Sequence, residues 1–216
     1  MYKDITAIIL AGGKSKRMSK EKALLHIGEK TIIEILVERL KSLFPNIILS
    51  TNNPESFTFL KIRMVEDFYK NVGPLGGIHA GLTESETNKN FIISCDLPLM
   101  SSELIDYICN YKTDKKIIVC KTGDYIEPTF GIYSKEIVEE LEVILNLNLQ
   151  YGLQPKDISI QNAIEKIGAE ILDATKLPFY NEDAFYNMNT FEDYIYVTKK
   201  LGVPNKFNQL KKAADT

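Results

Sequence analysis

The residues best suited to chemistry in this chain gather in one short stretch near the N-terminus. Gly12 and Gly13 end an apolar run, and five lysine or arginine side chains follow between Lys14 and Lys22, against one acid, Glu21. Glycine lets the main chain approach a ligand closely, and backbone N–H groups with lysine or arginine side chains bind phosphate oxygens. The stretch therefore predicts a cradle for a polyphosphate.

Two well-known glycine-rich phosphate motifs do not fit this stretch. Gly13-Lys14-Ser15 matches the end of the P-loop pattern, but the earlier glycine that the pattern requires falls on Ile8. The dinucleotide fingerprint also fails, because Gly12 and Gly13 are adjacent and no third glycine follows nearby. The stretch is thus a phosphate cradle of another kind or a solvated basic loop, and the surrounding chain has to decide.

Two aspartates are further candidates. Asp96 follows an apolar run and precedes Leu97 and Pro98, where the proline stiffens the turn. Mg²⁺ takes one or two protein carboxylates and completes its shell with water and substrate phosphate, so Asp96 is a candidate metal ligand. Asp67 lies just before a second glycine-rich stretch and could bind a nucleotide. Each aspartate could instead only shape its turn.

Alternating strands and helices are predicted to position these residues. Apolar runs indicate strands over 5–10, 47–51, 62–66, 91–95 and 116–121, and helical spacing indicates helices over 31–43, 55–60, 78–86 and 102–111. Continuous apolar strands predict a mostly parallel sheet covered on both faces, a Rossmann-like three-layer α/β/α fold. Ligands bind at the carboxyl ends of such strands, where Gly12, Asn52, Asp67 and Asp96 all fall.

The second half of the chain is less regular. We expect an extended segment over 125–133, helices over 134–147, 157–167 and 191–201, and a short strand over 169–172. The predicted organisation is one domain over 1–202, with a nucleotide-binding half (1–112), an acceptor-binding half (113–202) and a C-terminal tail (203–216).

Composition narrows the function classes. Net charge is −3, and five of the 26 basic residues lie in one stretch, so the rest of the chain is acidic. That charge balance argues against broad electrostatic binding to nucleic acid and favours one localised anion-binding site. We expect no signal peptide and no membrane span, which would need about 20 apolar residues. Three cysteines without C-x-x-C spacing and two separated histidines predict a reduced, cytoplasmic protein without disulfide or zinc site.

Five motifs, taken in order, resemble those of the MobA-type molybdenum cofactor guanylyltransferases of the nucleotidyltransferase superfamily. They are Leu10-Ala11-Gly12-Gly13-x-Ser15-x-Arg17-Met18-x-x-x-Lys22, Glu66-Asp67, Gly73-Pro74-Leu75-Gly76-Gly77, Cys95-Asp96-Leu97-Pro98 and Asn187-Met188-Asn189-Thr190. The first motif is shared with sugar-phosphate and cytidylyl transferases. The last, with Glu192 and Asp193 after it, points to the guanylyltransferase branch.

The resemblance implies transfer of GMP from GTP to the terminal phosphate of Mo-molybdopterin, with release of pyrophosphate and use of Mg²⁺. Such an acceptor is largely anionic at neutral pH, since the second pKa of a phosphate monoester is about 6, and needs no general base. Molybdoenzyme apoproteins and cofactor-delivery proteins are expected partners. The alternatives are a molybdopterin cytidylyltransferase, a sugar-phosphate nucleotidylyltransferase or a non-catalytic nucleotide sensor.

The resemblance also implies roles for individual residues. The implied catalytic residues are Arg17, Lys22 and Asp96, of which Asp96 also holds the metal, and the implied acceptor-binding residues are Asn187 and Asn189. The implied nucleotide-binding residues are Leu10, Ala11, Gly12, Gly13, Lys22, Ser50, Asn52, Asp67, Gly76 and Asp96.

Three positions depart from the family pattern. Ser50 stands where asparagine is frequent, and Asn52, two residues on, is the expected substitute. Gln161 stands where arginine is common, and Ser19 where glycine is common. The replacement of arginine by Gln161 concerns how the enzyme binds the anionic group of the second substrate.

Overall fold

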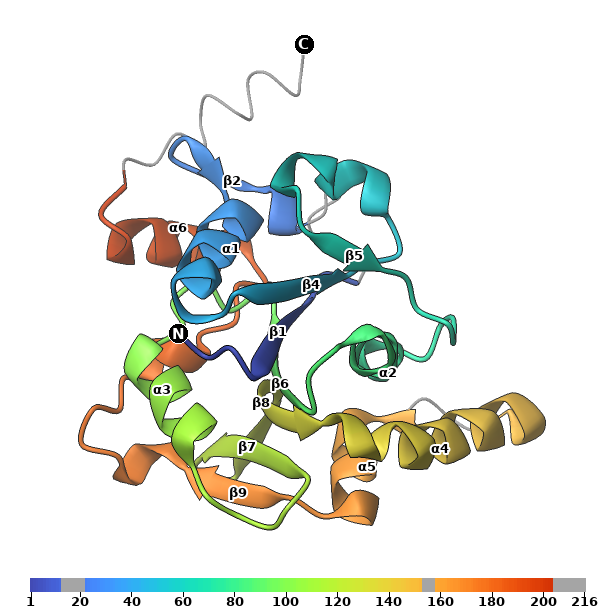
Figure 1. The fold of residues 1–216 in the computed structure, drawn as a ribbon. Helices are drawn as coiled ribbons and strands as arrows, with labels where there is room; N and C mark the ends of the chain where they lie inside the picture. The colour runs from blue at the N-terminus through green and yellow to red at the C-terminus, as the bar shows by residue number, and fades with distance from the viewer. Residues whose placement is uncertain (13–21, 153–157, 204–216) are drawn as a thin grey trace.

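A seven-stranded sheet with the strand order β5-β4-β1-β6-β8-β7-β9 forms the centre of the computed structural model, which describes residues 1–12, 22–152 and 158–203 (Figure 1). Its strands are β1 (Ile5–Leu10), β4 (Asn46–Ser50), β5 (Arg63–Val65), β6 (Lys89–Ser94), β7 (Ile117–Thr122), β8 (Tyr125–Ser134) and β9 (Glu170–Asp173). Neighbouring strands are parallel except β8, which runs antiparallel to both β6 and β7. The predicted mostly parallel α/β fold is confirmed.

Helices cover both faces of this sheet (Figure 1). They are α1 (Ile32–Leu43), α2 (Pro74–Glu84), α3 (Ser102–Asn110), α4 (Val138–Tyr151), α5 (Ile160–Ile167) and α6 (Phe191–Lys200). One core joins α1 and α3 to the sheet, and a second core joins α2, α4 and α5 to its other face. Successive β1 residues therefore face opposite cores, with Ile8 in the second and Ile9 in the first.

Helices α2 and α4 each begin four residues away from the predicted position. The helix expected to start at Ile78 starts at Pro74, because Gly73 takes a positive φ of 66° as N-cap and proline suits the first helical turn. The helix expected over 134–147 begins at Val138, after the 3-10 turn Lys135–Ile137, and ends at Tyr151. Glycine-rich sequence is thus part of a helix, where the prediction had a loop.

A small hairpin was missed by the sequence analysis. Strands β2 (His26–Ile27) and β3 (Lys30–Thr31) pair antiparallel, too briefly to produce an apolar pattern. This hairpin and α6 share a third, smaller core around Met188 and Tyr194. Helix α6 is therefore packed beside the hairpin formed by β2 and β3.

A bulge in the ladder between β7 and β8 sets up one wall of the site. Val119 pairs with Gly131, but the next residue, Cys120, pairs with Glu127. Three β8 residues, Pro128, Thr129 and Phe130, therefore have no partner on β7, and bulges of this kind bend a strand and are frequent beside functional sites. Tyr133 donates its hydroxyl to the Pro128 carbonyl at 2.6 Å and so holds the bulge in place.

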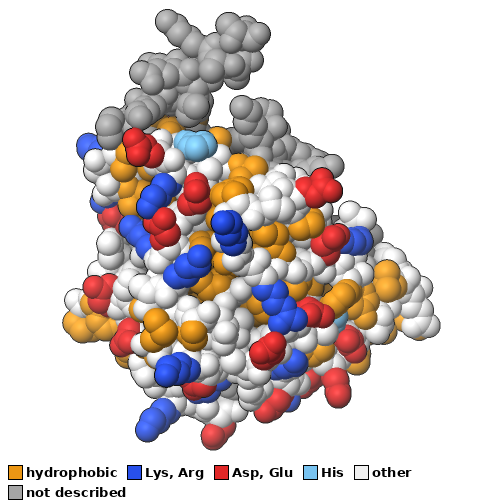
Figure 2. Space-filling view, turned by 45° about the horizontal axis from the view of Figure 1, so that its top comes forward, with side chains coloured by type: hydrophobic (Ala, Val, Ile, Leu, Met, Phe, Trp, Pro, Cys, Tyr) orange, Lys and Arg blue, Asp and Glu red, His pale blue; other side chains and the backbone are white. Residues whose placement is uncertain are grey.

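Charged side chains of both signs are interspersed over the face drawn in Figure 2, and hydrophobic side chains gather at its right edge, on the side where α4 projects in Figure 1. Within the described ranges, no helix is long and apolar enough to cross a membrane. The sheet runs from the first to the second half of the chain. The division into nucleotide and acceptor halves stays a prediction, and 204–216 of the predicted tail lie outside the described residues.

Candidate functional site

The carboxyl ends of the parallel strands meet at one edge of the sheet. Leu10 pairs with Ser50 of β4 and with Ser94 of β6, so the three strand ends lie level. Hydrogen bonds continue one residue beyond the strands: Ala11 N donates to Ser50 O at 2.8 Å, and Cys95 N donates to Leu10 O at 3.1 Å. The edge therefore brings Gly12, Asn52, Asp67 and Asp96 together, as such sheets do for ligand sites.

A cavity of about 700 Å³ opens at this edge. Its volume is within the usual range for small-ligand sites. The residues that line it are Leu10, Ala11, Gly12, Ser50, Thr51, Asn52, Asn53, Asp67, Lys70, Asn71, Gly73, Pro74 and Gly77.

Six of the predicted nucleotide-binding residues line this cavity: Leu10, Ala11, Gly12, Ser50, Asn52 and Asp67. Gly77 lines it, whereas Gly76 packs behind Asp67, where an added Cβ would lie 2.8 Å from the Tyr69 carbonyl. Lys22 and Asp96 do not line the cavity, and Asp96 follows β6, which flanks β1 on the side opposite β4. Gly13 and Arg17 lie outside the described residues, so their predicted roles remain predictions.

A polar network forms one wall of the cavity. Asn52 donates its Nδ2 to Asp67 Oδ2 at 2.7 Å, and its Oδ1 accepts from Lys70 Nζ at 2.8 Å. Ser50 Oγ lies 3.5 Å from Asp67 Oδ1. Asn52 thus joins a carboxylate to an ammonium group, and the wall offers hydrogen-bond donors and acceptors to ribose hydroxyls or a base edge.

Asp96 has a buried acceptor that fits a cation. Its Oδ1 is buried and accepts no hydrogen bond from any described residue. An unsatisfied buried acceptor of this kind costs about 1–3 kcal/mol. Among the described residues no three His, Cys, Asp or Glu side chains cluster as a metal cage. The arrangement therefore suits a cation such as Mg²⁺, which is held by one carboxylate and takes its other oxygens from water and phosphate.

The segment Asn187-Met188-Asn189 crosses this end of the sheet. Its main chain is tied to the metal candidate, since Met188 N donates to Asp96 O at 2.9 Å. Lys22 donates its Nζ to Asn189 Oδ1 at 2.5 Å, and Asn187 Nδ2 lies 3.4 Å from Glu127 Oε2. Lys22 of the first motif and Asp96 therefore both contact the last motif.

Helix α6 fixes the position of that segment. The Asp193 carboxylate accepts from the backbone N–H of Asn189 at 2.8 Å and of Thr190 at 2.7 Å, and Thr190 completes the capping box. The Tyr186 hydroxyl also donates to Asp193, at 2.7 Å. These hydrogen bonds lower the pKa of the Asp193 carboxyl although burial raises it. The segment is thus held rigidly over Asp96.

Glu127 is a site residue that the sequence analysis did not single out. Only 3% of its surface is exposed, and Thr129 donates to Oε1 from its hydroxyl at 2.7 Å. Burial raises the pKa of the Glu127 carboxyl, the Thr129 and Asn187 hydrogen bonds oppose that shift, and the nearby Asp96 charge adds to it. The Glu-Pro sequence in a predicted extended segment was the available signal, but the register that buries it was not visible.

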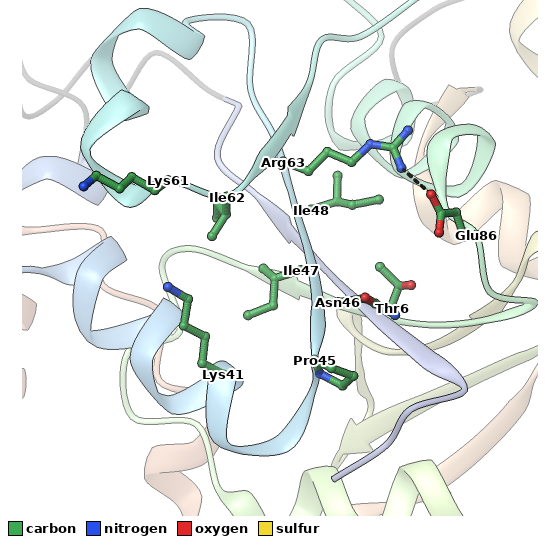
Figure 3. Close-up of a pocket in the computed structure, with 10 residues that line it drawn as sticks. All are labelled: Thr6, Lys41, Pro45, Asn46, Ile47, Ile48, Lys61, Ile62, Arg63 and Glu86. Carbon is green, nitrogen blue, oxygen red and sulfur yellow. Dashed lines mark ion pairs between the residues drawn. The ribbon is translucent and has the colours of Figure 1, made fainter.

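A second cavity, of about 340 Å³, lies at the opposite edge of the sheet, at the amino ends of β4 and β5 (Figure 3). Three basic residues line this second cavity: Lys41, Lys61 and Arg63. The Arg63 guanidinium forms an ion pair with the Glu86 carboxylate at 3.6 Å. No predicted site residue lines it. Those predicted site residues that the structure describes therefore lie away from this cavity.

Comparison with known proteins shows the family of this chain. Residues 7–155 match the family described as the MobA-like NTP transferase domain. The chain belongs to this family. It is therefore a nucleotidyltransferase, and the predicted resemblance and enzyme class are confirmed.

Relatives of this MobA-like chain align over nearly its full length. It is 33% identical to a probable molybdenum cofactor guanylyltransferase of Peptoclostridium acidaminophilum, over 90% of both chains. It is 34% identical to a protein of the same name from Carboxydothermus hydrogenoformans, over 88% of this chain and 93% of that one. The alignments extend beyond residue 155 into the half that carries Asn187 and Asn189.

Solved structures show the same MobA-like fold. Molybdopterin-guanine dinucleotide biosynthesis protein A from Archaeoglobus fulgidus superposes with a TM-score of 0.76 at 22% identity, over 91% of this chain and 98% of that one. The 4-diphosphocytidyl-2C-methyl-D-erythritol synthase of Anaerococcus prevotii reaches 0.64 at 15% identity, over 93% and 96%. At these identities the likeness shows the fold alone.

Proposed function

We propose that this MobA-like nucleotidyltransferase transfers GMP from GTP to the terminal phosphate of Mo-molybdopterin, and so forms molybdopterin guanine dinucleotide and pyrophosphate. The observation that carries the proposal is its 30–34% identity, over about 90% of the chain, to relatives named as guanylyltransferases. The edge geometry supports it, because the cavity side and the acceptor side meet at Lys22 and Asn189.

The reaction forms one P–O bond and breaks another. An oxygen of the acceptor phosphate attacks the α-phosphorus of GTP, and the bond from that phosphorus to the β-phosphate oxygen breaks to release pyrophosphate. Because the attacking monoester is already anionic near neutral pH, no Ser-His pair or other base is required. The protein has to position two anions in line and stabilise the leaving pyrophosphate.

The described residues suit these tasks. The Ala11 and Gly12 backbone at the cavity mouth would bind the nucleotide, with Asp67 and Asn52 on its wall, and Lys22 would neutralise phosphate charge. Asp96 would hold Mg²⁺, which supplies Lewis-acid stabilisation of phosphate oxygens. Asn187 and Asn189 would contact the acceptor. Guanine selectivity rests on the relatives, because no single described contact distinguishes guanine from the other bases.

Pyrophosphate release by the purified chain tests the proposal. With GTP, MgCl₂ and Mo-molybdopterin, we expect pyrophosphate and guanine dinucleotide product in equal amounts, with neither formed when the acceptor is left out. Parallel reactions with CTP, ATP and UTP test base choice. A preference for CTP would favour the alternative, a molybdopterin cytidylyltransferase, and no pyrophosphate with any triphosphate would contradict the proposal. Molybdoenzyme apoproteins and delivery proteins remain predicted partners.

A further inference from the structure

Glu127 is a buried carboxylate that the proposed reaction does not use directly. It lies in the β8 bulge, 3% exposed, and its Oε2 lies 3.4 Å from the side-chain nitrogen of Asn187. A buried charge is costly unless hydrogen bonds satisfy it. Here one carboxylate oxygen accepts from Thr129, and the other faces Asn187 Nδ2 at 3.4 Å. The carboxylate is thus placed between a rigid bulge and an acceptor-side asparagine.

We propose that Glu127 is a positioning residue that fixes the side-chain amide of Asn187 with its Oδ1 directed to the acceptor, so that the site selects an acceptor bearing an N–H or O–H donor. This inference rests on the proposed function for the identity of the acceptor. It does not require any ligand to touch Glu127.

The acceptors around the side-chain amide of Asn187 determine which way this amide is oriented. Its Nδ2 carries two N–H donors, and it lies 3.4 Å from both Glu127 Oε2 and the Phe185 carbonyl oxygen. Both donors therefore have acceptors within the protein, and a carboxylate can only accept. The Oδ1 accepts no hydrogen bond from the described residues and is left for a ligand.

The side-chain amide of Asn189 has the opposite orientation, with its oxygen bound by the protein and its nitrogen left for a ligand. Its Oδ1 accepts from Lys22 Nζ at 2.5 Å, and a lysine ammonium can only donate, so Asn189 presents its Nδ2 donors. The two asparagines, one on either side of buried Met188, thus offer one acceptor and one donor. An acceptor substrate whose anionic phosphate faces Asn189 and Lys22, and whose heterocycle presents an N–H group to Asn187, satisfies both.

The bulge makes Glu127 a rigid anchor for this purpose. The Pro128 carbonyl accepts from the buried Tyr133 hydroxyl at 2.6 Å, and Thr129 closes a second hydrogen bond onto Glu127. Functional side chains are held best by partners that are themselves fixed by packing. A glutamine at this position would have one accepting oxygen, enough for Thr129 or for Asn187 but not for both.

Steady-state kinetics with Glu127→Gln test the inference. We expect KM for Mo-molybdopterin to rise about tenfold, a loss equal to one good hydrogen bond, while the dissociation constant for GTP stays unchanged. Asn187→Ala should show the same rise, and the double variant should be no worse than Asn187→Ala alone. Asp183→Asn, which neutralises another buried carboxylate held by Tyr196 and Lys200, is the matched control and should keep the wild-type KM.

A second measurement separates this inference from the proposed function. The side-chain NH₂ resonance of Asn187 in ¹⁵N spectra should be slow to exchange in the wild type and lose protection in Glu127→Gln, with or without substrate. Failure of the wild type to use Mo-molybdopterin would overturn the proposed function and leave this signal as the test. Unchanged Asn187 exchange, or an equal loss of GTP and acceptor binding, would overturn the role of Glu127.

Discussion

Lys22 Nζ lies 2.5 Å from Asn189 Oδ1, across 167 positions of sequence. This hydrogen bond joins the lysine that closes the first motif to an asparagine in the last. Met188, beside Asn189, donates its N–H to the carbonyl of Asp96 at 2.9 Å. Lys22, which we propose binds phosphate, and Asp96, which we propose holds the metal, are therefore both tied to the segment Asn187-Met188-Asn189. The roles of Lys22, Asp96 and Asn189 can each be tested.

Lys22 and Asn189 are expected to act together. Lys22→Ala should weaken GTP binding by about tenfold or more, because it removes a phosphate-binding charge, and Asn189→Ala should raise the acceptor KM. In a double-variant cycle the two changes should be non-additive by about 1–2 kcal/mol, as for a hydrogen bond between a charged group and a neutral amide. Isothermal titration and pyrophosphate assays measure both.

Lys30→Ala is the control for that cycle. Lys30 is an exposed lysine on the neighbouring hairpin, paired with Glu38 at 2.6 Å. Its loss should change neither constant. Strict additivity of Lys22→Ala and Asn189→Ala would show that their hydrogen bond has no functional consequence.

Gly12 and Gly77 should differ sharply when each is replaced by alanine. An added Cβ at Gly12 meets no described atom within 4 Å, whereas at Gly77 it would lie 2.7 Å from Ser50 Oγ and 3.3 Å from Leu10 Cδ2. Gly77→Ala should destabilise the fold by about 1–3 kcal/mol through overpacking. Gly12→Ala should unfold like the wild type but weaken GTP binding, because the methyl group enters the nucleotide cavity.

Urea unfolding and GTP titration of the two variants test this contrast. A Gly12→Ala variant with wild-type GTP affinity would mean that the backbone at the cavity mouth does not approach the nucleotide. Loss of affinity at unchanged stability is expected only for Gly12→Ala, because the Cβ added at Gly77 meets Ser50.

Asp96→Asn should abolish the effect of magnesium on stability. A ligand that binds only the folded state at about 100 times its dissociation constant adds about 2.7 kcal/mol, so GTP with Mg²⁺ should raise the melting temperature of the wild type. Without the Asp96 charge, GTP should give the same small shift with and without Mg²⁺. Asp173→Asn, at the end of β9, should behave like the wild type. A preserved magnesium effect in Asp96→Asn would place the cation elsewhere.

Glu127→Gln should stabilise the protein at neutral pH while impairing acceptor use. Burial raises the pKa of Glu127 above its ordinary value of 4.5, and the facing charge of Asp96 adds to the shift. The folded state therefore binds this proton more tightly than the unfolded state, and the free energy of unfolding falls as pH rises through the folded pKa. The advantage of the glutamine variant should be largest above that pKa and shrink as pH falls toward 4.5.

Chemical denaturation from pH 4 to pH 8 measures this difference. A stability difference independent of pH would mean that Glu127 titrates alike in the folded and unfolded states. A less stable Glu127→Gln variant at pH 7 would mean that the lost hydrogen bond outweighs the relief of burying a charge.

Local pattern explains why much of the fold was predictable. The short, continuous apolar run of β1 favours a strand covered on both faces, and the same holds for the runs of β4 and β6. The predicted start of α2 at Ile78 is wrong for a local reason too: glycine-rich sequence favours a loop by composition, whereas Gly77 lies within the helix and packs closely against Ser50. The brief hairpin formed by β2 and β3 carries too few residues to show a period.

The sequence by itself determined the order of strands and helices and the edge at which Gly12, Asn52, Asp67 and Asp96 would meet, because strand direction and turn chemistry are local properties. Only the tertiary structure decided that a bulge buries Glu127 behind Asn187, that Lys70 reaches Asn52, and that Lys22 reaches Asn189. Those contacts depend on the antiparallel register of β8 and on the docking of α6 beside the first hairpin. Register and docking follow from how the whole core packs, and no single stretch of sequence specifies them.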